Sequence, residues 1–163
     1  MIEGSASALV QATPAEVIAF VLDLERYRLA DRKIASARVV AGDSAAGTVI
    51  LQGRLRGLRT PPDRQRYTVT PDGRTIEFRS ESSRWPGLLA RFHGIVHCQP
   101  LPNGATYVTH IERFTFTPLL ALLLDPYLRR WLRRDTADEV ARMAAHLGPA
   151  PRACGPAVSL LDD

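Results

Sequence analysis

The 163-residue sequence contains only two cysteines, Cys98 and Cys154, which exclude a disulfide framework and a zinc-finger pattern. Its longest apolar run, Leu119–Leu124, is far short of the roughly 18 residues that span a bilayer. The opening Met1-Ile2-Glu3 lacks the basic segment of a signal peptide, so we expect a cytoplasmic location. These absences leave a single soluble domain of the α/β or α+β class.

Lysine is also nearly absent, because Lys33 is the only one and every other basic residue is an arginine. The net charge of +4 would fit a partner such as nucleic acid or an anionic surface. However, no strand alternates basic and aromatic residues as a single-strand-binding platform would. The one dense arginine cluster is typical of a solvated helix face; it comprises Arg129, Arg130, Arg133 and Arg134. We therefore expect no nucleic-acid partner.

Common cofactor and nucleophile motifs are missing as well. The sequence has no phosphate-binding P-loop, no dinucleotide fingerprint after a strand and no G-x-S-x-G nucleophile elbow. His93 and His97 lie on a predicted strand, where their rings would stand about 13 Å apart and could not share one metal ion. The sequence therefore predicts neither a cofactor nor a metal site.

The N-terminal part predicts a strand and two helices. Residues Ser5–Ala12 are compatible with a first strand. Thr13, Pro14 and Glu16 then form a capping box with proline at the first helical position. The apolar residues that follow have helical spacing, at Val17, Phe20, Val21 and Leu24. A second short helix is predicted from Leu24 to about Ala30.

The middle of the chain changes to a period of two, which indicates strands. Turn residues such as Pro71-Asp72-Gly73 and Asn103-Gly104 separate them. Six strands joined by turns predict an antiparallel meander with one covered face. Their expected ranges are Ile34–Ala41, Thr48–Arg56, Arg64–Thr70, Thr75–Ser82, Arg91–Gln99 and Ala105–Phe116.

The C-terminal part predicts the cover of this sheet. Thr117-Pro118 and Asp125-Pro126 each pair a capping residue with proline, which predicts a short helix, a kink and a long helix to Leu147. The long helix has an apolar stripe at Leu128, Leu132, Val140, Met143 or Ala144, and Leu147. Gly148-Pro149 ends it, so we expect one domain over residues 1–147 and a Pro/Gly/Ala-rich tail over 148–163.

This order of elements resembles the START-like superfamily, also called SRPBCC or polyketide cyclase/dehydrase and lipid transport. The resemblance rests on Ala12-Thr13-Pro14-Ala15-Glu16-Val17, on the D-x-E-x-Y segment from Asp23 to Tyr27, and on the proline-punctuated entry to the last helix. It implies a helix-grip fold of the α+β class, in which a curved antiparallel sheet of about seven strands wraps a long C-terminal helix. It also implies an internal cavity for an apolar ligand. It implies no reaction, because binders, carriers and enzymes share the scaffold.

The last predicted strand carries the most informative polar pair, His110 and Glu112. Both residues lie on the same face of the strand as Val108, Phe114 and Phe116. Because this face is otherwise apolar, it should point toward the long helix and the cavity. A carboxylate on such a wall should have a raised pKa, and a neighbouring histidine could share its proton. The pair could serve a ligand, by hydrogen bonding to it or as an acid/base pair. Alternatively, it is a buried pair with a structural role only.

Other residues of the predicted strands are candidates for the same interior. Tyr67 and Ser80 could each offer a hydroxyl to a ligand or simply satisfy backbone groups. The expected apolar lining consists of Phe78, Val96, Phe114 and Phe116.

Three functions follow as hypotheses. The first is a non-catalytic binder or carrier of a lipid, isoprenoid or polyketide, because a mostly apolar interior with few polar groups is how ligand pockets are built. The second is a polyketide aromatase/cyclase that uses the polar residues above. The third is a protein- or ribosome-interacting member of the superfamily that uses the arginine face. A homodimer is left open.

Overall fold

The computed structural model describes residues 1–55, 57–81 and 91–148. Seven strands form one sheet in the order β1-β7-β6-β5-β4-β3-β2, and all neighbouring pairs are antiparallel. The strands are β1 (Ile2–Val10), β2 (Ile34–Gly42), β3 (Ala46–Leu55), β4 (Leu58–Val69), β5 (Thr75–Ser80), β6 (Arg91–Pro100) and β7 (Thr106–Thr115). From residue 149 onward the predicted tail lies outside the described residues. The domain boundary at residue 147 therefore stays a prediction.

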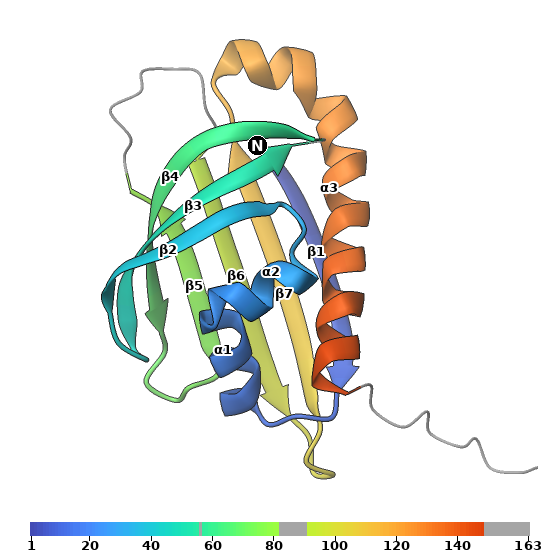
Figure 1. The fold of residues 1–163 in the computed structure, drawn as a ribbon. Coiled ribbons are helices and arrows are strands. Elements are labelled where there is room, and N and C mark those ends of the chain that lie inside the picture. The colour runs from blue at the N-terminus through green and yellow to red at the C-terminus, as the bar shows by residue number, and fades with distance from the viewer. Residues whose placement is uncertain (56, 82–90, 149–163) are drawn as a thin grey trace, which may run out of the picture.

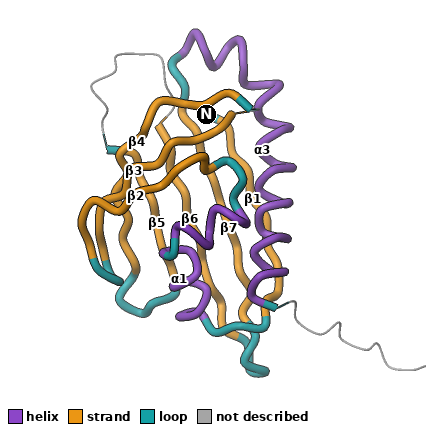
Figure 2. Tube along the Cα trace, in the orientation of Figure 1, coloured by secondary structure: helices purple, strands orange, loops and turns teal. Residues whose placement is uncertain are grey.

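The described residues also form three helices: α1 (Pro14–Leu22), α2 (Leu24–Ala30) and α3 (Pro118–Leu147). The sheet curves around α1 and α2, while α3 runs along β1 at one edge and also contacts α2 and β7 (Figure 1). Short loops join most of these elements (Figure 2). The predicted curved antiparallel sheet with a long C-terminal helix is confirmed. In the described part of the chain, no helix is both long and apolar enough to cross a membrane.

The structure contains the capping box predicted at the start of α1. The Glu16 side chain accepts from the Thr13 backbone N–H at 2.7 Å, and the Thr13 hydroxyl accepts from the Glu16 N–H at 3.3 Å. The first backbone N–H groups of a helix have no partner within the helix, and these two side chains satisfy them. The capping box therefore fixes where the chain turns from β1 into α1.

Strand β4 begins at Leu58, six residues before the predicted start at Arg64. Pro61 and Pro62 argue against a strand there, because proline cannot donate a hydrogen bond to a neighbour. Within the described residues, the pairs of β4 with β5 begin at Gln65, so none of them includes Pro61 or Pro62. Pro61 and Pro62 therefore lie outside the β4–β5 ladder, where their missing N–H groups are not needed.

Helix α3 is continuous, whereas the sequence predicted two helices that meet at Asp125-Pro126. Pro126 lies inside the helix. A proline there removes one backbone hydrogen bond and bends a helix without necessarily ending it. The first turns of α3 accordingly run across the end of the sheet, and the remainder turns to follow β1 (Figure 1). All four residues of the arginine cluster are exposed, as predicted.

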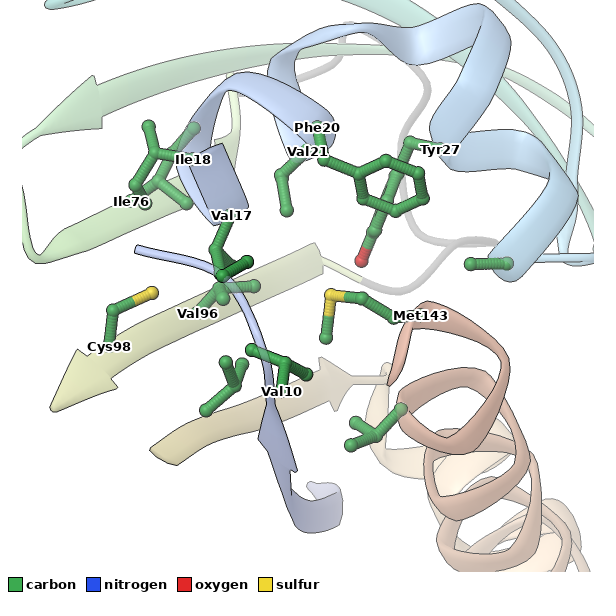
Figure 3. Packing of buried hydrophobic residues seen from close by; sticks show 14 of the residues in the cluster. Val10, Val17, Ile18, Phe20, Val21, Tyr27, Ile76, Val96, Cys98 and Met143 are labelled. Atoms are coloured by element: carbon green, nitrogen blue, oxygen red, sulfur yellow. The ribbon is translucent and has the colours of Figure 1, made fainter. Parts of the chain in front are cut away.

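The core has two parts. The larger lies between the sheet, α1, α2 and the last turns of α3, and Figure 3 shows its members Val17, Phe20, Tyr27, Val96 and Met143 converging from these elements. The smaller lies where α3 crosses β1 and β7. It is built from Ile2, Leu128 and Leu132, with Phe114, Phe116 and Trp131 packed against them.

Candidate functional site

A pocket opens between the inner face of the sheet and α2. Its apolar walls come from Leu24, Ile34, Leu51, Phe78, Phe92, Gly94 and Val96, and its polar lining from Tyr27, Asp31, Gln65, His110 and Glu112. The volume is about 30 Å³, enough for roughly two water molecules. It is therefore a narrow, mostly apolar space with ionisable groups in one wall.

The alternation predicted for β7 places its polar pair in this wall. Val108, His110 and Glu112 are buried, whereas Tyr107 on the opposite face of the strand is exposed. Glu112 is only 1% exposed. Strand register sets Glu112 opposite Gly94 and Gly94 opposite Phe78, so the pocket's floor crosses three neighbouring strands.

Lys33 is the centre of the polar wall. Its ammonium nitrogen lies 2.6 Å from carboxylate oxygens of both Asp135 and Glu139, and 3.2 Å from oxygens of both Asp31 and Glu112. Three separate parts of the chain supply these acids: the end of α2, the middle of β7 and two adjacent turns of α3. The only lysine of the chain is thus the counter-ion of a buried acidic cluster, defined here as Asp31, Glu112, Asp135 and Glu139.

Gly4 on β1 allows α3 to approach this cluster closely. A methyl group added at Gly4 would lie 2.4 Å from the Thr136 hydroxyl oxygen and 3.0 Å from Leu132. Because that space is free of side chain, Thr136 reaches past β1 and donates to Glu112 Oε2 at 2.8 Å. The glycine therefore lets a helix hydroxyl hold the carboxylate of β7.

Tyr27 and His110 bring two further groups to Glu139. The Tyr27 hydroxyl donates to Glu139 Oε1 at 2.5 Å, and His110 Nδ1 lies 3.2 Å from the same oxygen as an ion pair rather than an aligned hydrogen bond. Burial alone would lower the pKa of His110, but the charges of Glu139 and Glu112 outweigh it and raise the pKa to about 8. His110 is therefore mostly protonated at neutral pH.

The buried acids differ in how readily they ionise. Burial, reinforced by the charge of Glu139 and opposed by that of Lys33, raises the pKa of Asp31 to about 7. Burial likewise raises the pKa of Glu112, although Lys33 opposes the effect. Burial acts the same way on Glu139, but His110 and Lys33 together hold its pKa well below the usual range. Glu139 is thus the most readily ionised of the three, Asp31 titrates near neutrality, and burial shifts the pKa of Glu112 upward.

Three of these acids have the spacing of a metal site. Oxygens of Asp31, Glu112 and Glu139 lie within 4.8 Å of one another. The Lys33 ammonium already stands among them at 2.6 to 3.2 Å, where a bound cation would be. A divalent ion would have to displace it, so the residues fit an internal ammonium better than a metal.

Four of the predicted site residues lie together at the pocket: Phe78, Val96, His110 and Glu112. The other four are not among the residues that line it. The Tyr67 hydroxyl donates to the Asp43 carbonyl at the β2–β3 turn, and the Ser80 hydroxyl donates to Asp63. Phe114 and Phe116 pack in the smaller core cluster, because α3 bends over that end of the sheet.

Sequence reasoning missed most of the polar wall. The available signals were the single lysine and the polar residues within the apolar stripe of α3. Thr136 and Glu139 follow Leu132 by four and seven residues and precede Met143, so they occupy the buried face of the helix. Asp31 and Gln65 carried no comparable local pattern.

Solved structures share this fold. A protein of Thermus thermophilus, TTHA0849, superposes with a TM-score of 0.72 at 17% identity, over 89% of this chain and 96% of that one. The Zhui aromatase/cyclase of Streptomyces sp. R1128 gives 0.71 at 15% identity, over 94% and 97%. The human StarD13 lipid transfer and protein localization domain gives 0.64 at 21% identity, over 89% and 76%. At these identities the likeness concerns the fold alone.

No functionally curated protein matches this sequence. A family profile does, over residues 1–148, a range that includes every described residue. The profile covers every strand and helix that builds the pocket and its polar wall. The chain therefore belongs to the polyketide cyclase/dehydrase and lipid transport family.

Proposed function

We propose that this chain binds a hydrophobic small molecule, such as a lipid, isoprenoid or polyketide, whose polar group meets the buried acids. The observation that carries the proposal is the pocket itself: apolar walls with a few ionisable side chains converging in one of them. Membership of a family described by cyclase, dehydrase and lipid-transport functions supports the same conclusion.

The polar wall offers the ligand a hydrogen-bond donor in a buried environment. Asp31 and Glu112 both line the pocket and both have raised pKa values. A carboxyl group that keeps its proton donates a hydrogen bond, whereas an ionised one only accepts. A ligand carbonyl or hydroxyl at this wall would therefore accept a hydrogen bond from the protonated form of Asp31, with Lys33 behind it.

Binding requires the pocket to widen, because about 30 Å³ is smaller than any such ligand. Phe92 is the side chain placed to move. Its ring covers Gly94, where an added methyl group would lie 2.7 Å from the ring, and its centroid lies 5.1 Å from that of Phe114 with the two rings tilted by 53°. Rotation of Phe92 away from Gly94 would extend the pocket over a stretch of bare backbone.

The first experiment identifies the ligand and tests the pocket. Solvent extraction and mass spectrometry of protein purified from its native host should recover a reproducible apolar compound. In vitro, the apolar fluorescent probe N-phenyl-1-naphthylamine should bind, and Val96→Phe, which fills the pocket, should weaken its affinity at least tenfold. The measurement is a fluorescence titration, with stability checked by urea unfolding.

Val49→Phe is the matched control. Val49 is as deeply buried as Val96, with 1% exposure each, but does not line the pocket. Both changes overpack the core and should cost about 1–3 kcal/mol of stability. Only Val96→Phe should reduce probe binding beyond what instability explains. Equal effects of the two substitutions, or no uptake by the unaltered protein, would contradict the proposal.

A second candidate function is that of a polyketide cyclase or aromatase. It is favoured by two groups that titrate near neutrality in one pocket, Asp31 with a pKa of about 7 and His110 with one of about 8. Such groups can both give and take protons at physiological pH. The two candidate functions are separated by incubating the protein with the extracted compound or its precursor. A new product supports the enzyme, and recovery of the unchanged ligand supports the binder.

A further inference from the structure

Gln65 supplies a second polar point in the pocket, apart from the acidic cluster. It lies on β4, is 5% exposed and lines the pocket. Its amide nitrogen donates to Asp63 Oδ2 at 2.8 Å. Among the described residues no donor reaches its carbonyl oxygen Oε1, although that atom is fully buried. Buried acceptors are rarely left without a donor, so this one calls for a partner.

The orientation of this amide is fixed by its neighbours. Asp63 Oδ2 also accepts from the Ser80 hydroxyl at 2.6 Å, and the Ser80 oxygen in turn accepts from the Phe92 backbone N–H at 2.9 Å. Since a carboxylate only accepts, the end of Gln65 that faces Asp63 must be the NH₂ group. Turning the amide would bring two acceptors together, so Oε1 is held away from Asp63.

The position of Gln65 separates it from the acidic cluster. Gln65 pairs with Ser80 of β5, whereas Glu112 lies on β7, so the two stand three strand spacings apart, about 14 Å along the sheet. Phe78, Phe92 and Gly94 form the floor between them. A ligand that spans this floor meets the acids with one part and Gln65 with another.

We infer that the ligand carries an O–H or N–H group that donates to Gln65 Oε1, and that Gln65 selects hydroxylated or N–H-bearing apolar molecules over equally large ones without a donor. This inference rests on the proposed function. The selectivity comes from a buried acceptor that a ligand lacking a donor would leave unpaired.

The test compares 2-naphthol with 2-methylnaphthalene, which have nearly the same size and shape but differ in the hydroxyl donor. Each competes with N-phenyl-1-naphthylamine for the unaltered protein, for Gln65→Leu and for the control Gln52→Leu. Gln52 lies on β3 outside the pocket lining. The affinity ratio of 2-naphthol to 2-methylnaphthalene should fall at least fivefold in Gln65→Leu and stay unchanged in Gln52→Leu.

The ratio is insensitive to general loosening of the fold, because both compounds need the same opening. Gln65→Met, which keeps a flexible chain of similar length without the amide, replaces Gln65→Leu if that variant does not fold. An unchanged ratio in the folded variant would overturn the inference while leaving the proposed function intact; an ordered water on Oε1 would give this result. If neither compound nor the probe binds the unaltered protein, both the proposed function and this inference fail.

Discussion

At the residue scale, Lys33 is the cation that joins the four members of the acidic cluster. Its charge faces four carboxylates at 2.6 to 3.2 Å, and its side chain is only 11% exposed. Burial alone would lower the pKa of Lys33, but the surrounding acids raise it well above the usual value. The ammonium is thus held in its charged form as the counter-ion of a largely buried group of acids, in which Asp135 with 21% exposure is the most accessible.

Replacing Lys33 by methionine should therefore destabilise the protein strongly. The substitution keeps much of the apolar stem but leaves the acidic cluster without its cation, and removal of one partner from a buried ion pair costs about 3–5 kcal/mol. Urea unfolding at neutral pH measures the loss. Part of it should return at mildly acidic pH, where the cluster takes up protons.

Arg64→Met is the corresponding surface control. Arg64 pairs with Glu81 at 2.7 Å, but its side chain is 55% exposed, so water screens the pair. Such surface pairs contribute about 0–1 kcal/mol. A loss in Lys33→Met no greater than that in Arg64→Met would show that the cluster does not need its counter-ion.

At the scale of elements, the contact between β1 and α3 sets the geometry of the polar wall. Helix α3 lies against β1 where Gly4 has no side chain, and two of its residues, Asp135 and Glu139, bind Lys33 from that position. Thr136 extends between them to Glu112. The distance from helix to sheet therefore decides whether the acids, the hydroxyl and the ammonium can meet.

Gly4→Ala should push α3 away from β1. The new methyl group would overlap Thr136 and press on Leu132, at a cost of about 1–3 kcal/mol. Urea unfolding of Gly4→Ala, Thr136→Ala and the double variant forms a double-mutant cycle. We expect the losses to be less than additive, because Thr136→Ala removes the atom in conflict. Ser5→Ala, on the exposed face of the same strand, should have little effect, and additive losses would contradict the close-packing argument.

For the whole molecule, the buried groups make folding depend on protons. The pKa of Asp31 rises from 3.8 to about 7 on folding, so its contribution to stability is full below pH 3.8 and is lost as the pH rises through 7. The pKa of His110, which faces Glu139, Glu112 and Lys33, rises from 6.5 to about 8. Its contribution is full below 6.5 and is lost as the pH passes 8. The pKa of Glu139 is lowered from 4.5, so its contribution to stability is lost as the pH falls. That loss begins only below pH 4.5 and does not affect the range above it.

Stability should consequently decrease between about pH 5 and pH 8, by roughly 2 kcal/mol or more. Urea midpoints measured across this range test the sign. Asp31→Asn, which mimics the neutral acid and keeps an acceptor for the backbone N–H of Lys33, should flatten the decrease between pH 5 and 7. Asp72→Asn, at an exposed turn, should keep the original profile. Stability that increases with pH over this range would refute the assigned proton balance.

Much of the fold could be predicted because its signals are local. The capping box at Thr13 and Glu16 involves residues three apart, and the inward face of β7 follows from alternation along one strand. The predictions failed where the structure of a segment depends on residues that are distant in the sequence but close in space. The prolines of β4 lie outside the described pairs of β4 with β5, and Pro126 bends α3 without ending it.

The sequence by itself determined the inward face of β7, and hence that His110 and Glu112 are buried. Only the tertiary structure decided what they meet. Lys33 contacts Asp135 and Glu139 across 102 and 106 residues, and such pairings depend on how the curved sheet and α3 close on each other. Alternation and helical period specify the direction of a side chain along its own element. They carry no information about its partner on another element, so the ion cluster arises only when β7, α3 and the end of α2 come together around Lys33.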